Sequence, residues 1–178
     1  MLGHVKVPPV GLITEINDFY DFQLQCVKII PEKAEVVYLN KKYLSNNTVA
    51  FVTQHGKNGP SYLNLVGANK QTWDNNVTMS LVVYEYIGKG YKRSFVEFRF
   101  KLCEMLHFDP TIGAMVARTG LVCPIPPALH RLVNMTIPGG EFKYVVFFKK
   151  CMVTLELTVT STGESMGKAN LYFSIIHK

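Results

Sequence analysis

The sequence is short of charge. Only 18% of its 178 residues are Lys, Arg, Asp or Glu, and 48% are hydrophobic. The charged share lies below the usual quarter of a globular protein, which argues against disorder, a coiled coil and a strongly charged tail. No run of about 18 apolar residues is present, so no membrane-spanning helix is expected. A chain of this length predicts one domain over residues 1–178.

Cysteine is also scarce, and metal-binding spacing is missing. No CxxC pair occurs, and no two histidines stand at a ligand spacing beside a cysteine, so neither a metal site nor a cofactor is predicted. An even and sparse number of cysteines is typical of disulfides in a secreted domain. The four cysteines are Cys26, Cys103, Cys123 and Cys151.

The motifs of common enzymes are missing as well. The chain has no GxSxG, HExxH or GxxxxGK[ST] motif, and Gly88-Lys89-Gly90 is better explained as a hairpin turn than as a phosphate loop. We interpret Glu104 and Asp109 as acids of helix N-termini or of the surface. The sequence therefore predicts a protein that is not an enzyme. Its scattered histidines are expected to be solvated or singly hydrogen-bonded: His4, His55, His107, His130 and His177.

Three N-glycosylation sequons are present, at Asn46, Asn76 and Asn134. Pro8 and Pro9 stand where a signal peptide would need its apolar core, which leaves a cytosolic protein and a secreted protein without its signal as alternatives. The sequons and the cysteines favour secretion, with the signal removed. Residues 1–18 are expected to form an extended arm.

What is abundant is β-type patterning. Alternating apolar and polar residues predict short strands separated by turns that contain Pro, Gly and Asn. A hairpin is expected to turn at 87–90, and the long signal over 141–159 is expected to bend near 149–151. The expected strands are 20–26, ending at Pro31-Glu32-Lys33, then 34–43, 48–54, 77–86, 91–100, 141–159 and 170–176, with a turn at 162–165.

Residues 101–118 change to a helical period. Apolar residues recur at helical spacing on both sides of Asp109-Pro110, and Pro110 divides the segment into two short helices. The Cys123–Pro127 segment, with three prolines, is predicted to be an extended loop.

Three segments, in this order, resemble the ganglioside-activator proteins and their insect relatives, which include secreted chemosensory proteins and a large family of unknown function. They are the Cys-bearing segment 100–106, the Cys123-Pro124-Ile125 loop, and the Pro-Gly-aromatic strand start at 137–142, followed by a terminal hairpin that turns at Gly163–Gly167. The resemblance covers residues 80–178 well and 20–80 by strand pattern alone.

The resemblance implies a secreted β-cup: a single-domain sandwich of seven to nine antiparallel strands with a short helical insert near 101–118. It also implies a disulfide between Cys103 and Cys123, which leaves Cys26 with Cys151. The sequence departs from the family near Ala169 and Asn170, where the activator has a cysteine and this chain has none.

Within such a cup, strands 96–100 and 145–157 are expected to face the ligand, and the helical insert is expected to serve as an adaptable lid. The alternative is that these residues pack on one another and leave no cavity. The predicted lining is Val96, Phe98, Phe100, Met105, Ile112, Met115, Val116, Val145, Phe147, Leu155 and Leu157.

The net charge of +6 is concentrated in pairs interleaved with tyrosines, at Lys41-Lys42, Lys89 with Lys92-Arg93, and Lys149-Lys150. Such pairs favour peripheral contact with an anionic membrane surface, or serve to blunt exposed strand edges. No nucleic acid is expected as a partner.

The sequence thus predicts a secreted binding protein that sequesters a lipid or another hydrophobic small molecule. The rival hypothesis is an extracellular interaction or structural protein with a filled core that acts through its surface.

Overall fold

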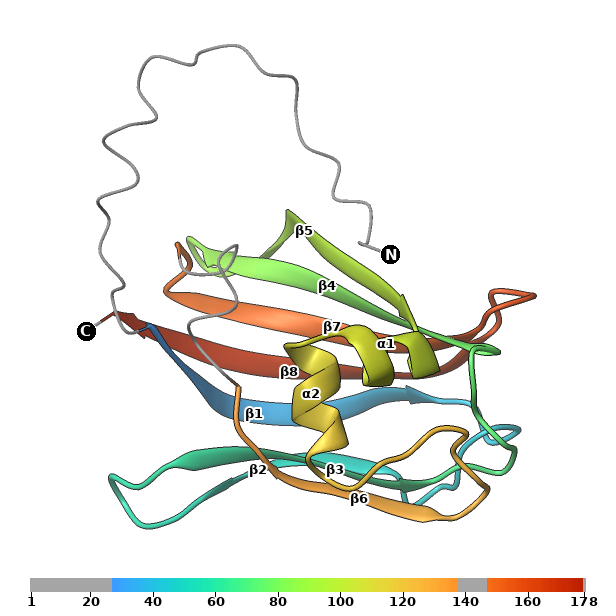
Figure 1. Cartoon of the computed structure of the whole chain (residues 1–178). Helices are drawn as coiled ribbons and strands as arrows, with labels where there is room; N and C mark the ends of the chain where they lie inside the picture. The colour runs from blue at the N-terminus through green and yellow to red at the C-terminus, as the bar shows by residue number, and fades with distance from the viewer. Residues whose placement is uncertain (1–26, 138–146, 178) are drawn as a thin grey trace.

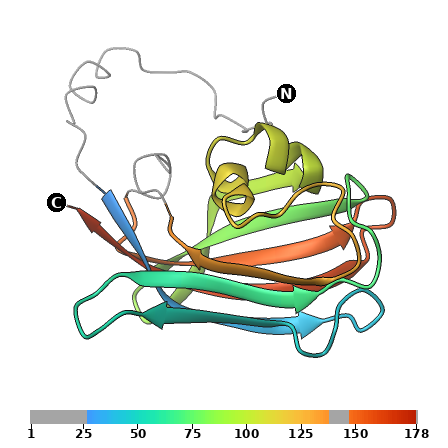
Figure 2. The same cartoon turned by 60° about the horizontal axis from the view of Figure 1, so that its bottom comes forward.

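A computed structural model describes residues 27–137 and 147–177, which form two antiparallel sheets packed face to face (Figures 1 and 2). The fold is mainly β, with eight described strands and two short helices, and it confirms the predicted class. The five-stranded sheet has the order β1-β8-β7-β4-β5, and the three-stranded sheet has the order β2-β3-β6. Its strands, in chain order, are β1 (Val27–Leu39), β2 (Val49–Gln54), β3 (Ser61–Ala68), β4 (Val77–Ile87), β5 (Gly90–Lys101), β6 (Leu129–Met135), β7 (Lys150–Val159) and β8 (Ser165–His177).

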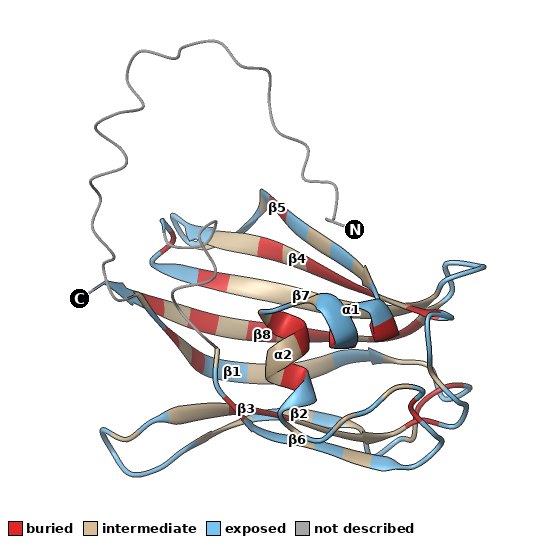
Figure 3. Cartoon of the chain, viewed as in Figure 1, coloured by how far each residue is buried: buried red, intermediate tan, exposed pale blue. Residues whose placement is uncertain are grey.

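The inner face of the five-stranded sheet carries apolar side chains in rows across the strands. The register aligns residues of all five strands in one row: Val36, Ala169, Leu155, Leu81 and Phe98. Because side chains alternate along a strand, this register turns one apolar set inward and leaves the outer face to polar residues. Figure 3 shows buried residues along the middle of the sheet and on the helices that cover it.

Two kinds of cover lie over this inner face. The three-stranded sheet contacts β1 through β2 and β3, while α1 (Leu102–Phe108) contacts β4 and β5. The second helix, α2 (Ile112–Ala117), lies between α1 and β6 (Figure 1). The helical segment therefore completes the second layer where the smaller sheet ends.

The two helices confirm the predicted insert and its division at Asp109-Pro110. Oδ2 of Asp109 accepts hydrogen bonds from the backbone N–H groups of Thr111, Ile112 and Gly113, at 3.0, 2.9 and 3.3 Å. This carboxylate satisfies donors that the first turn of a helix leaves unpaired, as the interpretation of Asp109 expects. At the start of α1, Oδ1 of Asn75 accepts hydrogen bonds from the backbone N–H groups of Cys103 and Glu104.

The Cys103–Cys123 disulfide is present, with a Cα–Cα separation of 5.7 Å, and it ties α1 to the loop that precedes β6. Within the described residues Cys151 has no disulfide partner; its thiol is buried, and burial raises its pKa to about 12. Cys26 lies outside the described residues. The Cys26–Cys151 bond stays a prediction.

Three expectations about strands are corrected. Pro31 does not stop a strand, because it lies in the edge strand β1, which pairs on one side only. The register of β1 against β8 shifts between Pro31 and Lys33, as in a β-bulge. The same strand ends at Leu39, before the predicted end at 43. The last turn lies between Val159 and Ser165, so Gly167 belongs to β8.

Strands β3 and β6 are absent from the predicted set. The hairpin of β4 and β5, the strand β2 and the closing strand β8 are confirmed, although β8 begins five residues earlier than predicted. Of the predicted strand 141–159, the described part from Lys150 is β7, and residues 141–146 lie outside the described residues. The predicted arm 1–18 and strand 20–26 lie outside them too.

Neither of the two described helices has the length and apolar character needed to cross a membrane.

Candidate functional site

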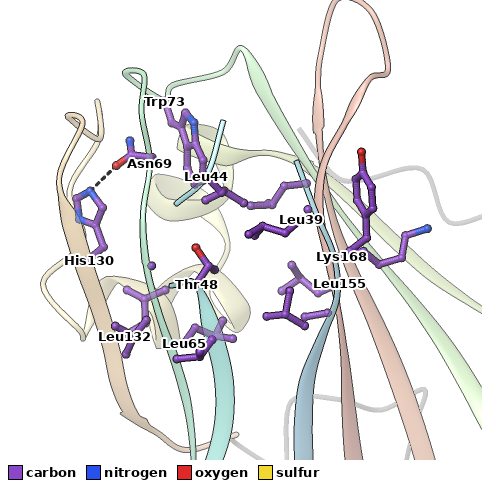
Figure 4. Close-up of a pocket in the computed structure, with 18 of the residues that line it drawn as sticks. Leu39, Leu44, Thr48, Leu65, Asn69, Trp73, His130, Leu132, Leu155 and Lys168 are labelled. Atoms are coloured by element: carbon purple, nitrogen blue, oxygen red, sulfur yellow. Dashed lines mark hydrogen bonds between the residues drawn. The ribbon is translucent and has the colours of Figure 1, made fainter. Parts of the chain in front are cut away.

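An apolar cavity of about 150 Å³ lies between the two sheets (Figure 4). The five-stranded sheet forms one wall through β1, β7 and β8, and the three-stranded sheet forms the opposite wall through β2, β3 and β6. Loops at one end of the sandwich form the remaining wall of the cavity. The lining residues are Val36, Tyr38, Leu39, Leu44, Thr48, Val49, Leu65, Val66, Gly67, Asn69, Trp73, Leu121, Ile125, His130, Leu132, Leu155, Leu157, Gly167, Lys168 and Ala169.

Small residues belong to both walls of the cavity. Inward positions of β8 decrease in size along the strand, from Phe173 and Leu171 to Ala169 and Gly167. Gly67 of β3 lies in the opposite wall. In a close-packed interior a small side chain leaves space that a larger one would fill, and at Ala169 this space is part of the cavity.

Two of these glycines also let neighbours approach closely. A Cβ atom on Gly67 would lie 2.7 Å from Oγ1 of Thr48, and one on Gly167 would lie 2.9 Å from Cδ1 of Leu44. Both contacts bring the loop between β1 and β2 against the cavity. The glycines therefore determine the shape of the site as well as its volume.

The cavity reaches the surface beside the edge strands β1 and β2. Tyr38 of β1 and Val49 of β2 both line it, and each is 46% exposed. β1 and β2 belong to different sheets and are not paired, so no backbone hydrogen bonds join the two sheets on this side of the sandwich. We identify the gap between β1 and β2 as the mouth of the cavity.

The end wall is built from two loops that are held together. Trp73 and Ile125 exchange backbone hydrogen bonds of 2.9 and 2.8 Å. Asn69 joins the same loops, since its Nδ2 atom donates to the carbonyls of Gln71 and Ile125, and its Oδ1 atom accepts from His130 of β6 (Figure 4). Because the Cys103–Cys123 disulfide fixes the loop of Ile125, this wall is anchored to α1.

Most polar side chains around the cavity are hydrogen-bonded, and the indole N–H of Trp73 is the exception within the described residues. Nε2 of His130 lies 3.0 Å from both Oδ1 of Asn69 and the carbonyl oxygen of Pro126, which are acceptors, so this nitrogen carries the hydrogen. Oγ1 of Thr48 donates to the carbonyl of Ser45. The lining in the described residues contains no carboxylate and no thiol. Chemically, the cavity offers apolar contact.

A second hollow, of about 290 Å³, lies at the same end of the sandwich. Trp73 borders both spaces. Lys42 beside it pairs with the carboxylate of Glu164 at 3.2 Å, and the hydroxyl of Tyr43 donates to the same carboxylate. These two partners, the tyrosine first, lower the pKa of Glu164. The hollow is lined by Lys42, Tyr43, Gln71, Trp73, Asn76, Val77, Val159 and Met166.

Of the predicted lining residues, Leu155 and Leu157 border the cavity. Phe147 is 70% exposed, and Val145 lies outside the described residues. The others are packed into hydrophobic clusters beneath the helices and between the sheets: Val96, Phe98, Phe100, Met105, Ile112, Met115 and Val116. The predicted lid is therefore part of a packed region, and most of the wall comes from strands outside the predicted lining.

The residues that were missed include Gly67, Gly167 and Ala169. A glycine inside a strand often marks a close approach of another chain segment, and both glycines do so here. That signal is present in the sequence, but it does not show which strands face each other.

The predicted basic pairs are all on the surface, and salt bridges neutralise only part of them. Lys42, Arg93 and Lys150 pair with Glu164, Glu97 and Glu32. No acidic partner occurs within the described residues for Lys41, Lys89, Lys92 and Lys149. The asparagines of the three sequons, Asn46, Asn76 and Asn134, are exposed.

Comparison with known proteins gives no relative: no family model matches the chain, and no curated protein matches it. The described residues contain no cluster of three or more His, Cys, Asp or Glu side chains able to hold a metal ion. The geometry of the cavity is therefore the basis of the functional argument.

Proposed function

We propose that this protein binds a compact apolar molecule in the cavity between its sheets and acts by sequestering it. The observation that carries the proposal is the apolar cavity between the two sheets, where Ala169 in the wall leaves space that a larger side chain would fill. Burial of apolar ligand surface, at about 25 cal/mol per Å², would drive binding.

The volume limits the size of the ligand. Sites for drug-sized molecules commonly measure about 300 to 1,000 Å³, and this cavity is smaller, at about 150 Å³. An engineered apolar cavity of about 150 Å³ stays dry and binds benzene. We therefore expect a molecule of that size, or the end of one lipid chain, in place of the whole lipid that the resemblance implies.

Secretion remains part of the proposal. The Cys103–Cys123 disulfide and the three exposed sequons support an extracellular location. Lys41, Lys89, Lys92 and Lys149, without acidic partners in the described residues, support peripheral contact with anionic lipid during loading or delivery.

The three-stranded sheet supports a second candidate function. Its outer face exposes Phe51, Leu129 and Val133, the second of them by 57%. An apolar sheet face of this kind serves contact with another protein. In that case the cavity would be incidental and the protein would act through its surface.

Benzene titration, followed by isothermal calorimetry, separates the two candidates. Ala169→Leu places a larger side chain in the wall, whereas Ala117→Leu adds the same atoms at an exposed position at the end of α2. We expect one benzene per chain in the wild type and in Ala117→Leu, and an affinity at least about tenfold lower in Ala169→Leu. Equal uptake by both variants, or none by the wild type, would reject the cavity as the functional site.

A further inference from the structure

The edge strands of the two sheets differ in how they are protected against pairing with another chain. An edge strand is paired on one side only, so its other side presents backbone N–H and C=O groups that a further strand can bind. Proteins commonly block such an edge with charged side chains, proline or a β-bulge. In the described part of the chain the edge strands are β1 and β5 of the larger sheet, and β2 and β6 of the smaller one.

Three of these edges carry such devices. β1 contains Pro31, and its register against β8 shifts at two points. β6 contains Arg131, and its register against β3 shifts once. β5 also has a register shift against β4, and it carries five charged residues: Lys92, Arg93, Glu97, Arg99 and Lys101.

β2 carries none of them. Its sequence from Val49 to Gln54 is VAFVTQ, which contains no charged residue and no proline. It pairs with β3 in one regular register along its whole length, and none of its six residues is buried. Six residues is an ordinary length for a strand, so β2 is not protected by being short. A regular, uncharged edge of this kind is suited to the addition of a strand.

The residue pattern of β2 suits pairing with itself. Closed two-fold symmetry is the commonest arrangement of homo-oligomers, and it pairs identical strands antiparallel. With the axis at Phe51, this residue faces the partner's Phe51. Val49 then faces the partner's Thr53, and Ala50 faces the partner's Val52. Every pair joins residues from the same face of the sheet, as the period of two requires, and no pair brings like charges together.

Phe51 gains most from this arrangement. Its side chain is 39% exposed on the outer face of the three-stranded sheet. Aromatic residues that lie directly opposite each other on paired strands stabilise a sheet. Pairing through β2 therefore removes apolar surface from water at the centre of the contact, in addition to forming backbone hydrogen bonds along the edge.

We propose that two copies of this chain pair antiparallel through β2, with Phe51 at the two-fold axis, and so join their three-stranded sheets into one sheet of six strands. This interface goes beyond the proposed function and does not depend on it. The second copy also becomes part of the cavity mouth, because the partner's Thr53 lies beside Val49, which lines the cavity.

A charge exchange at position 51 tests this register. Phe51→Lys and Phe51→Glu each place two like charges opposite each other at the axis. By sedimentation equilibrium we expect a wild-type dimer, and a dissociation constant at least about tenfold higher in each variant. An equimolar mixture of the two variants should recover the dimer, because a lysine then faces a glutamate. Recovery in the mixture requires that residue 51 of one copy faces residue 51 of the other.

Phe95→Lys is the matched control. Phe95 is 87% exposed and lies on β5, an edge strand with charges and a register shift. The same substitution there should leave the dissociation constant of the dimer within about twofold of the wild type. A Phe95→Lys variant as weak as Phe51→Lys would show that the two copies do not meet at β2, and would overturn the proposal.

Hydrogen exchange on the wild type covers the case in which the variants at position 51 do not fold. Amides of an unpaired edge exchange with solvent, and a second strand protects them. The β2 amides should therefore exchange more slowly at high than at low protein concentration, while those of β5 should not change.

A wild type that stays monomeric overturns the proposal, as does a mixture of Phe51→Lys and Phe51→Glu that stays monomeric when both are folded. Exchange at β2 that does not depend on protein concentration also overturns it. None of these results affects the cavity, which benzene titration tests separately. Loss of the dimer in the single variants with recovery in the mixture, or concentration-dependent protection confined to β2, supports it.

Discussion

The same sheet face is filled at one side and hollow at the other. Under the helices, Met105 and Leu106 interlock with Met79 and Leu81 of β4, and Gly113 of α2 lies against the backbone of α1. Beside β1, Ala169 faces the smaller sheet across a cavity. Both regions are apolar, so hydrophobicity does not distinguish them. The difference lies in side-chain size, and it separates a region that confers stability from one that is available to a ligand.

Loss of the disulfide should have the largest effect, because it anchors the filled region. The bond closes a loop with a sequence separation of 20, for which chain entropy gives about 3 kcal/mol. We expect Cys103→Ser with Cys123→Ser to lower the free energy of unfolding by about this amount in urea titration. Reduced wild-type protein should match the double variant. A change below about 0.5 kcal/mol would show that the helices need no covalent anchor.

Added volume in the filled region should be the next most harmful change. A Cβ atom on Gly113 would lie 1.9 Å from the carbonyl oxygen of Met105, so Gly113→Ala must push the two helices apart. We expect a loss of about 2 kcal/mol, in the range found for overpacking. Gly90→Ala is the matched control, because a Cβ there meets no atom within 4 Å. Equal unfolding free energies for the two variants would contradict the close packing of α1 and α2.

Added volume beside the cavity should be tolerated. Ala169→Leu extends into empty space, so we expect its unfolding free energy to stay within about 1 kcal/mol of the wild type, or to rise slightly as in other cavity-filling changes. The comparison with Gly113→Ala, under the same urea conditions, sharpens the contrast between the two regions. A loss larger than that of Gly113→Ala would mean that the hollow region is as tightly packed as the helical one.

A fall in pH should have the smallest effect on stability, and it should act through Glu164. Tyr43 and Lys42 lower the pKa of Glu164, so the folded state favours the carboxylate. The stability from these contacts is present above the ordinary pKa of about 4.3 and is lost as the pH falls through the lowered value. Glu164→Gln lacks this contribution. Its Tm should therefore lie slightly below that of the wild type at pH 6, and the gap should close as the pH falls through the lowered pKa of Glu164. A gap that stays constant would contradict the role of the carboxylate.

Local patterns predicted the local parts of this fold. The β4–β5 hairpin has its turn signal in Gly88 and Gly90, and the two helices are separated by Pro110. The prediction of the Cys103–Cys123 bond came from the resemblance to the ganglioside-activator proteins, and no local pattern indicated it. Pro31 misled the prediction because its effect depends on whether a strand lies at an edge, and edge position is a property of the whole sheet.

The cavity depends on contacts between distant parts of the chain. Gly67 and Ala169 are about a hundred residues apart, and only the packing of β3 over β8 places them in one cavity. Period-two patterning shows which residues point inward but not what lies opposite them. For this reason the predicted lining includes Leu155 and Leu157, which border the cavity, together with Met105 and Ile112, which lie in the packed region under the helices.

The most direct test is native mass spectrometry of protein purified from its own source, with organic extraction of whatever it carries and benzene titration of the extracted protein. We expect one compact, largely apolar molecule per chain, and uptake of benzene after its removal. Protein that carries no such molecule and takes up no benzene would contradict the account, and would direct attention to the exposed apolar face of the three-stranded sheet.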